Sequence, residues 1–269
     1  MHIDTLLDSV KQQAKSNIQD ITLAVPSSWA QGRTLYGGIS ASLVYQAMRE
    51  VVDTDKVMRS LSTNFIGPIE ADSELSITVE VLREGKNVTQ VVARLIQNSK
   101  VAVMSQASFG VARQSKILIP NNCQHKMDYP QKPSFMPHIP KVTPKFLGNF
   151  ELAKTAGGWP FTGQKDSDLQ GWMRFKKPPT DFSDAHLVAL IDIWPPTVLQ
   201  LLRWPAMAST MSWNLEFIHP HQKISGSDWF AYQAQTRQAS DGYAHTEANI
   251  WDKHGTLVAI SRQVVAVFA

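Results

Sequence analysis

The sequence predicts an α+β protein made of two copies of one unit, in which a helix is followed by an antiparallel meander of strands. Three observations support this fold class. The hydrophobic period changes from about 3.6 over residues 40–52 to two over residues 73–86. The motif Phe-Ile-x-Pro begins at Phe65 and again at Phe217, 152 residues later. A proline-rich segment, typical of a connector, lies between the two copies.

The composition suits one large or two modest globular domains. Of the 269 residues, 43% are hydrophobic and 18% are charged, which is enough to form real cores. The 26 basic and 23 acidic residues leave a net charge of +3 with no run of lysine or arginine, so we expect no nucleic-acid partner. No uncharged apolar stretch approaches the ~20 residues of a membrane span. The single Cys123 has no internal disulfide partner, which fits a reducing, cytoplasmic location.

The first copy is expected to span residues 1–112. It begins with an amphipathic helix rather than a signal peptide, because Asp4 and Asp8 interrupt the apolar positions. After the helix of the repeated unit come three strands, separated by turn residues at 84–86 and 98–99. In the first of these strands apolar and polar side chains alternate, as in a half-buried strand.

Residues 113–145 are expected to form an extended connector. Six prolines fall within them: Pro120, Pro130, Pro133, Pro137, Pro140 and Pro144. Proline at this density disfavours a helix and a central strand, because it lacks a backbone N–H and has a fixed φ. The second copy is therefore expected to occupy residues 146–269.

The second copy repeats the order of the first. Its elements are expected at 171–175 for the first strand, 186–202 for the helix, and 227–240, 243–251 and 257–269 for the later strands. In the last strand Ser261 matches Ser105 of the first copy, 156 residues earlier. The displacement drifts only from 152 to 156 residues over the whole unit, which favours two copies of one fold over chance.

Three polar residues of the second copy are candidates for a site, because a polar group among apolar neighbours must be hydrogen-bonded or is costly to bury. Asp192 lies in LVALIDIWPP, either as the N-cap of a helix beginning at the two prolines or as a functional carboxylate. Gln263 lies in LVAISRQVVAVFA, either as a structural amide or as a functional one, and Arg262 is on the opposite strand face. Thr210, in ASTMSWNLEF, is an ordinary strand residue on sequence alone.

Two other patterns are weaker. GGISAS, residues 37–42, partly matches the Gly-x-Ser-x-Gly turn of serine hydrolases, but Ser42 replaces the last glycine, so a helix N-terminus with paired glycines is favoured. His219 and His221 could share a metal, but Pro220 separates them and no third ligand is near in sequence. A surface turn is favoured there, and no metal is expected.

Three stretches, GRTLYGGISASLVYQAM (32–48), STNFIGPIEADSELSITVEVLREGK (62–86) and GTLVAISRQ (255–263), carry a resemblance to a known family. With the repeat, they resemble the double-hotdog acyl-CoA thioesterases of the thioesterase II type over nearly the whole chain. The resemblance implies two tandem hotdog folds, each a long helix wrapped by an antiparallel sheet. It also implies that the catalytic aspartate, threonine and glutamine of the family are Asp192, Thr210 and Gln263.

The activity that this resemblance implies is hydrolysis of acyl-CoA to free acid and CoA, without a cofactor. The reaction needs a water held against the carbonyl carbon, a group that takes its proton, and donors for the oxyanion. Asp192 would be the base, or alternatively a nucleophile, and Thr210 and Gln263 would hold the water. The backbone N–H groups of Gly37 and Gly38, at a helix N-terminus, would bind the substrate oxyanion.

Projection through the repeat predicts one site per chain, near the interface between the copies. Asp192 falls on Gly38 and Gln263 on Ala107, so the first copy lacks both groups. Two alternatives stay open: a hotdog enoyl-CoA hydratase or dehydratase, for which His186 is the nearest histidine, and a non-catalytic acyl-CoA-binding protein. Exposed edges of fused hotdog sheets often associate, which allows for a homo-oligomer.

Overall fold

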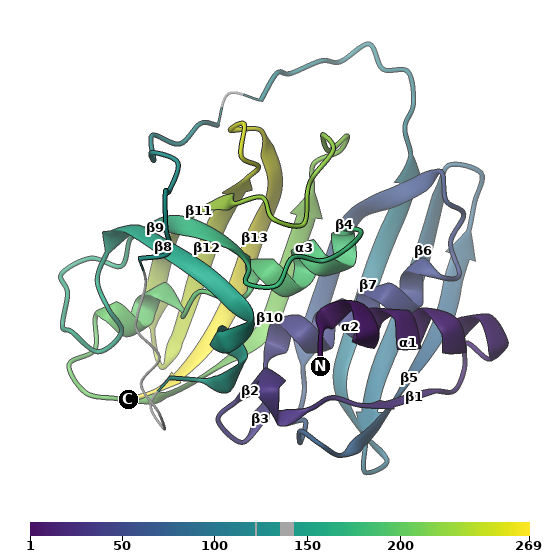
Figure 1. The fold of residues 1–269 in the computed structure, drawn as a ribbon, viewed down its shortest axis with the longest axis horizontal. Helices are drawn as coiled ribbons and strands as arrows, with labels where there is room; N and C mark the ends of the chain where they lie inside the picture. Colours follow the sequence, from purple (N-terminus) through teal and green to yellow (C-terminus); the bar gives the residue numbers. More distant parts are fainter. Residues whose placement is uncertain (122, 135–142) are drawn as a thin grey trace.

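The computed structural model describes residues 1–121, 123–134 and 143–269. Residues 122 and 135–142 of the expected connector, including Pro137 and Pro140, lie outside this part of the chain. Eleven of the described strands form one antiparallel sheet (Figure 1). In order across the sheet they are β1 (Ile21–Ala24), β5 (Glu74–Glu84), β6 (Val88–Gln97), β7 (Lys100–Val111), β4 (Lys56–Phe65), β10 (Met207–Phe217), β13 (Leu257–Phe268), β12 (Tyr243–Trp251), β11 (Phe230–Ser240), β9 (Leu169–Phe175) and β8 (Phe150–Gly157). The short strands β2 (Ala30–Gln31) and β3 (Thr34–Leu35) form a separate pair.

The sheet consists of two halves with the same strand order, counted outward from the central pair β4–β10. β7, β6, β5 and β1 follow β4 on one side, and β13, β12, β11 and β9 follow β10 on the other. At this central pair Thr63 lies opposite Trp213, and Leu61 lies opposite Leu215. The two copies are therefore joined edge to edge into a continuous sheet. β8 is an additional edge strand of the second half that the sequence analysis did not expect.

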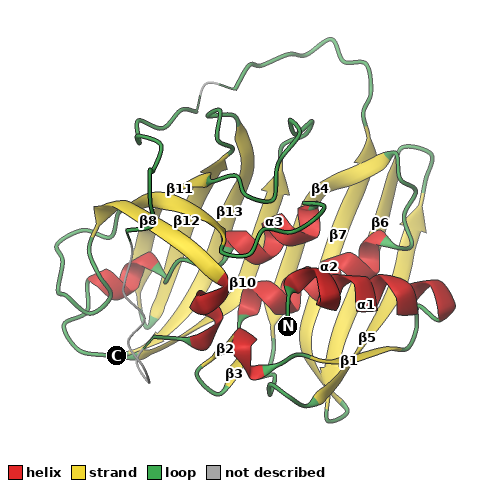
Figure 2. Cartoon of the chain, in the orientation of Figure 1, coloured by secondary structure: helices red, strands yellow, loops and turns green. Residues whose placement is uncertain are grey.

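Within the described residues, three helices lie on one face of this sheet: α1 (Ile3–Ser16), α2 (Gly37–Arg49) and α3 (Asp184–Ile191) (Figure 2). The same part of the chain has three 3-10 turns: η1 (Ser27–Trp29), η2 (Lys145–Asn149) and η3 (Thr197–Gln200). α1 is amphipathic, as expected, and buries Ile3, Leu6, Leu7 and Val10. Every residue of α3 after the first is buried, and the helix packs against α2. A helix that is apolar on every side belongs in the core, so α3 is a central core helix.

The helix expected at residues 186–202 is wrong in its extent. α3 ends at Ile191, and only the short turn η3 follows at residues 197–200. Pro195 and Pro196 lie between them; each lacks an N–H, and a residue that precedes proline avoids the helical conformation. Asp192 is consequently the C-cap of α3, so its interpretation as an N-cap is also wrong.

Both strands of the central pair carry a β-bulge at the same point of the repeat. Arg59 is the extra residue of β4 opposite β7, and Met211 is the extra residue of β10 opposite β13. The two residues are 152 positions apart, as are Phe65 and Phe217. The extra residue of a bulge changes the face of the sheet to which the side chains beyond it point. The two halves therefore share both the strand order and the side-chain orientation along these strands.

The last strand of the first half, β7, ends at Val111, and the turn η2 begins at Lys145. The division into residues 1–112, 113–145 and 146–269 stays a prediction.

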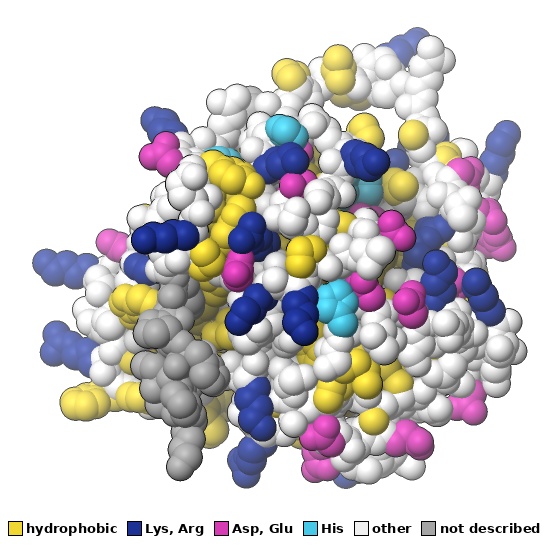
Figure 3. Space-filling model, in the orientation of Figure 1, with side chains coloured by type: hydrophobic (Ala, Val, Ile, Leu, Met, Phe, Trp, Pro, Cys, Tyr) yellow, Lys and Arg dark blue, Asp and Glu magenta, His cyan; other side chains and the backbone are white. Residues whose placement is uncertain are grey.

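Among the described helices, none combines the length and the hydrophobicity that a membrane crossing requires. On the face shown in Figure 3, basic and acidic side chains are interspersed, with hydrophobic side chains gathered between them.

Candidate active site

Asp192 lies between the ends of two helices that belong to different copies. It follows α3, whose free carbonyl groups disfavour a negative charge, and it faces the first residues of α2, whose N–H groups favour one. A backbone hydrogen bond joins Gly38 to Asp192. A Cβ atom placed on Gly37 would lie 2.9 Å from Asp192 Oδ2. Both glycines expected to bind substrate therefore lie against the carboxylate, at the interface between the copies.

The three polar candidates of the second copy form one hydrogen-bonded chain. Gln263 Nε2 donates to Asp192 Oδ1 over 2.9 Å. Thr210 Oγ1 donates to Gln263 Oε1, also over 2.9 Å. All three side chains are partly buried. Since the hydroxyl of Thr210 fixes the amide of Gln263, the amide must present its N–H side to the carboxylate.

The β-bulge at Met211 determines the direction of the Thr210 side chain. Trp213 lies opposite Gln263 in the β10–β13 pair, and Thr210 lies opposite Val265. Gln263 and Val265 share a face of β13, because residues two apart in a strand point the same way. Without the extra residue, Thr210 would point away from that face, since it is three positions from Trp213. The bulge therefore makes the contact with Gln263 geometrically available.

The environment of Asp192 favours its neutral form. Burial raises its pKa from an ordinary value of 3.8 to about 7. The hydrogen bonds from Gln263 and from the Gly38 backbone act in the opposite direction, because they stabilise the charged form. The carboxyl group therefore titrates near neutral pH, where a general base is most effective.

Aromatic side chains surround this carboxylate. The Tyr36 hydroxyl donates to the Ala189 carbonyl over 2.8 Å, and the Tyr232 ring stacks on Trp194 at a centroid distance of 6.0 Å. Burial, and then the nearby Asp192, raise the pKa of both tyrosines, so both hydroxyls stay protonated. These two tyrosines have no distinguishing signal in the sequence, because an inward-facing aromatic residue resembles any other core residue.

The corresponding positions of the first copy carry no polar site. By the shared bulge, Met58 corresponds to Thr210, and Ala107 corresponds to Gln263 through the displacement of 156. Both Met58 and Ala107 are buried. The geometry therefore agrees with the expectation that one copy alone supplies the polar groups.

The serines of the GGISAS segment and His186, the other candidates for catalytic groups, form hydrogen bonds with groups other than Asp192. Ser40 and Ser42 are buried, and their hydroxyl groups donate to the carbonyls of Tyr36 and Ala185. His186, the histidine nearest in sequence to Asp192, lies at the other end of α3. Its Nε2 is 3.0 Å from Asp4 Oδ1. None of these groups points a free nucleophile or acid at Asp192.

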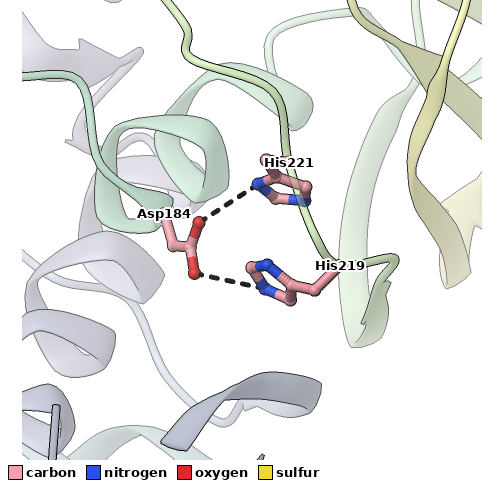
Figure 4. A group of neighbouring side chains, drawn as sticks. All are labelled: Asp184, His219 and His221. Carbon is pink, nitrogen blue, oxygen red and sulfur yellow. Dashed lines mark ion pairs between the residues drawn. The ribbon is translucent and has the colours of Figure 1, made fainter. Parts of the chain in front are cut away.

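Among the described residues, one group of side chains could hold a metal ion: Asp184, His219 and His221 (Figure 4). The expectation that no third candidate ligand lies near the two histidines is wrong, because Asp184 lies beside them. Only 10% of the His219 side chain and 11% of the His221 side chain are exposed. The third candidate ligand, Asp184, is the first residue of α3. It is far from His219 and His221 along the chain, so the sequence does not show that the three are neighbours.

Comparisons with known proteins agree with the architecture. A family model described as the acyl-CoA thioesterase N-terminal domain matches residues 25–110, and one described as the C-terminal domain matches residues 120–267. A relative, acyl-CoA thioesterase 2 of Haemophilus influenzae, is 21% identical over 253 residues, which cover 86% of each chain.

Solved structures share the fold at low sequence identity. A conserved protein of unknown function with a hot dog fold from Alicyclobacillus acidocaldarius is 20% identical, with a TM-score of 0.82, covering 93% of this chain and 94% of that one. An acyl-CoA thioesterase II from Mycobacterium marinum is 19% identical, with a TM-score of 0.73, covering 94% of each. These likenesses confirm the two tandem hotdog folds. With family models matching both halves, the chain belongs to the acyl-CoA thioesterase family and is a thioester hydrolase.

Proposed function

We propose that the chain hydrolyses acyl-CoA thioesters to the free acid and CoA by means of a water molecule that Asp192 activates. The observation that supports this proposal most is the chain of hydrogen bonds from Thr210 through Gln263 to Asp192. It ends on a carboxyl group whose pKa is about 7 and which lies against a helix N-terminus.

The hydrogen-bonding capacity of the three side chains fits one water. Gln263 keeps a second amide N–H, because only one contacts Asp192, and Thr210 keeps its oxygen lone pairs, because its proton goes to Gln263. A water between them can donate to Asp192 and to Thr210 and accept from Gln263. Its remaining lone pair is then free to attack the thioester carbonyl carbon.

The N–H groups at the start of α2 are assigned to the oxyanion. In the resting state the Gly38 backbone contacts Asp192. When Asp192 takes the proton of the water, its negative charge disappears as charge develops on the thioester oxygen. The Gly38 N–H can then donate to the oxyanion instead of the carboxylate, and the positive end of the α2 dipole stabilises the oxyanion. Gly37 leaves the approach open, because a Cβ there would also lie 3.2 Å from the ring of Phe65.

Asp192→Asn tests the proposal. We expect a loss of several hundredfold in kcat, about 3–4 kcal/mol of transition-state stabilisation, because the variant cannot accept the proton. The measurement is release of free thiol from acyl-CoAs between acetyl and palmitoyl, with circular dichroism to verify folding. Asp241→Asn, at an exposed hairpin position, is the matched control and should keep full activity. If folded Asp192→Asn hydrolysed its best substrate within about threefold of the wild type, Asp192 would not be the base.

A single turnover in ¹⁸O-labelled water tests the role of Asp192. If Asp192 activates water, the first product acid carries the label from the solvent. If Asp192 attacks the thioester itself and labelled water then cleaves the mixed anhydride at the carboxyl carbon of Asp192, the first product is unlabelled and the enzyme gains the label; that outcome would show that Asp192 is a nucleophile. We expect labelled acid in the first turnover, with enzyme in excess over substrate.

The compartment is also a proposal. Cys123 is free, and a free cysteine fits the reducing cytoplasm that the sequence analysis expects. Association into a homo-oligomer stays a prediction, which size-exclusion chromatography with light scattering would measure.

A further inference from the structure

We propose that Asp184, His219 and His221 form a site for a divalent transition-metal ion, most simply Zn²⁺. The site would have three protein ligands and a fourth position open to a cavity. It is separate from the proposed active site and does not depend on thioester hydrolysis.

The spacing of the three side chains suits one shared ion better than pairwise hydrogen bonds. Asp184 Oδ2 is 3.5 Å from His219 Nε2, and Asp184 Oδ1 is 3.5 Å from His221 Nδ1. Hydrogen bonds between charged groups are shorter, about 2.7–2.9 Å. Ligands of a tetrahedral zinc with bonds of about 2.0–2.2 Å lie roughly 3.3–3.5 Å apart. All three ligand atoms lie within 4.8 Å of one another, so small side-chain rotations would close the set.

His219 has a buried nitrogen that needs a partner. Its Nε2 has no hydrogen-bond partner within the described structure, although the atom is inaccessible to solvent. Buried polar atoms are nearly always satisfied, so such an atom points to a ligand at this position. The two imidazole rings are stacked, with centroids 4.1 Å apart, and both ligand nitrogens face Asp184 (Figure 4).

A second layer of contacts orients all three ligands. His221 Nε2 is 3.3 Å from the Val258 carbonyl, and donation to that carbonyl leaves the lone pair on Nδ1, the nitrogen that faces Asp184. A hydrogen bond joins the His219 side chain to the backbone of Met58. The Tyr45 hydroxyl donates to Asp184 Oδ2 over 3.4 Å. Outer-shell partners of this kind are characteristic of built metal sites.

The cluster lines a large cavity. Asp184, His219 and His221 line a cavity of about 1100 Å³, together with the basic side chains of Arg59 and Lys223. With three protein ligands, the remaining tetrahedral position would face this cavity and take a water or a small anion. The open position distinguishes the site from a closed structural zinc site.

The position of the cluster follows from the repeat. Met58 and Phe217, which contact His219, correspond to Thr210 and Phe65, which lie at the proposed active site. The cluster therefore lies beside the counterpart of the active site, where the first copy has Met58 and Ala107 in place of Thr210 and Gln263. α3 carries Asp184 at its start and is followed by Asp192, eight residues later and about 12 Å along the helix axis.

Isothermal titration of the EDTA-dialysed full chain with Zn²⁺ tests the proposal. We expect one ion per chain, with loss of that binding in His219→Ala and in His221→Ala, and at least about tenfold weaker binding in Asp184→Asn. His254→Ala, at an exposed turn, is the matched control and should bind as the wild type does. Co²⁺ provides an independent readout, because a four-coordinate tetrahedral ion has a strong visible absorption that His221→Ala should lack.

Thermal unfolding guards against variants that fail to fold. Zn²⁺ should raise the Tm of the wild type and of His254→Ala, because an ion that binds only the folded state stabilises that state. It should not raise the Tm of His221→Gln, although this variant retains a polar side chain of similar length. The absence of stoichiometric binding to the wild type would overturn the proposal. So would equal affinity in the folded double variant His219→Ala/His221→Ala.

Discussion

At the scale of single residues, the distinctive feature is a carboxyl group in conflicting surroundings. The end of α3 and burial disfavour the charge of Asp192, whereas Gln263 and the start of α2 favour it. The balance places its pKa at about 7, so small changes in the neighbours should change the fraction of enzyme that is ionised.

We expect kcat/KM to rise with pH and to level off above about pH 7, because Asp192 must be ionised to accept a proton. Removal of the Gln263 donor, in Gln263→Leu, should move the midpoint to higher pH, since that hydrogen bond lowers the pKa of Asp192. Initial rates of thiol release between about pH 5 and pH 9 provide the measurement. A profile that is flat over this range, or a midpoint unaffected by Gln263→Leu, would contradict the assignment.

The same carboxyl group should reduce stability when it is charged. Its folded-state pKa of about 7 is above its ordinary value, so its contribution to stability is fully present below about pH 4 and is lost as pH rises through 7. Asp192→Asn, which cannot ionise, should therefore be more stable than the wild type at about pH 8, on the order of 2 kcal/mol after allowance for partial exposure. Urea unfolding at about pH 8 and pH 5 measures this; a gain equal at both pH values would exclude ionisation of Asp192 as its cause.

At the scale of elements, the sequence predicts the three meander strands of each half, but it assigns no range to the central strands β4 and β10 and does not predict the side-chain directions there. The alternation of Leu75, Ile77 and Val79 identifies β5, because only one face of it is buried. The bulge at Met211 has no local signal in the sequence, so no counting of alternate positions could have placed Thr210 beside Gln263. The resemblance to a family names these residues as site candidates, but only the register explains how they meet.

Deletion of Met211 should turn Thr210 to the other face of β10 and lower kcat on the order of 100-fold, because the amide of Gln263 would lose its partner. Met211→Ala keeps the extra residue and should retain activity, since this side chain is 45% exposed. Thiol-release kinetics on both folded variants make the comparison. Equal activity of the two would show that the bulge does not position the site.

At the scale of the whole molecule, the repeat was the most informative part of the sequence. The displacement of 152 to 156 residues predicts two like halves, and the strand order confirms them. The break between α3 and η3 was missed because periodicity continues through Pro195 and Pro196, although the backbone cannot. The group of Asp184, His219 and His221 was missed because Asp184 lies 35 residues before His219 in the chain, and the two meet only when the second half folds.

One ligand should bind per chain. A non-hydrolysable acyl-CoA analogue, titrated calorimetrically into the wild type, should give a stoichiometry of one, because Met58 and Ala107 replace the polar groups in the first copy. Met58→Thr, which introduces a hydroxyl at the counterpart of Thr210, should leave that number unchanged, since Ala107 offers it no amide. Two equivalent sites in the wild type would contradict the single-site arrangement.

The pairing of β4 with β10 has a consequence for enzyme at low concentration. The proposed site takes its glycines from one half and its carboxylate from the other, and both halves belong to one chain. Because the two halves are covalently connected, their effective concentration relative to each other does not depend on the amount of protein in solution. Specific activity should therefore not fall on dilution through dissociation of the two halves, whereas a site shared between two separate chains would come apart.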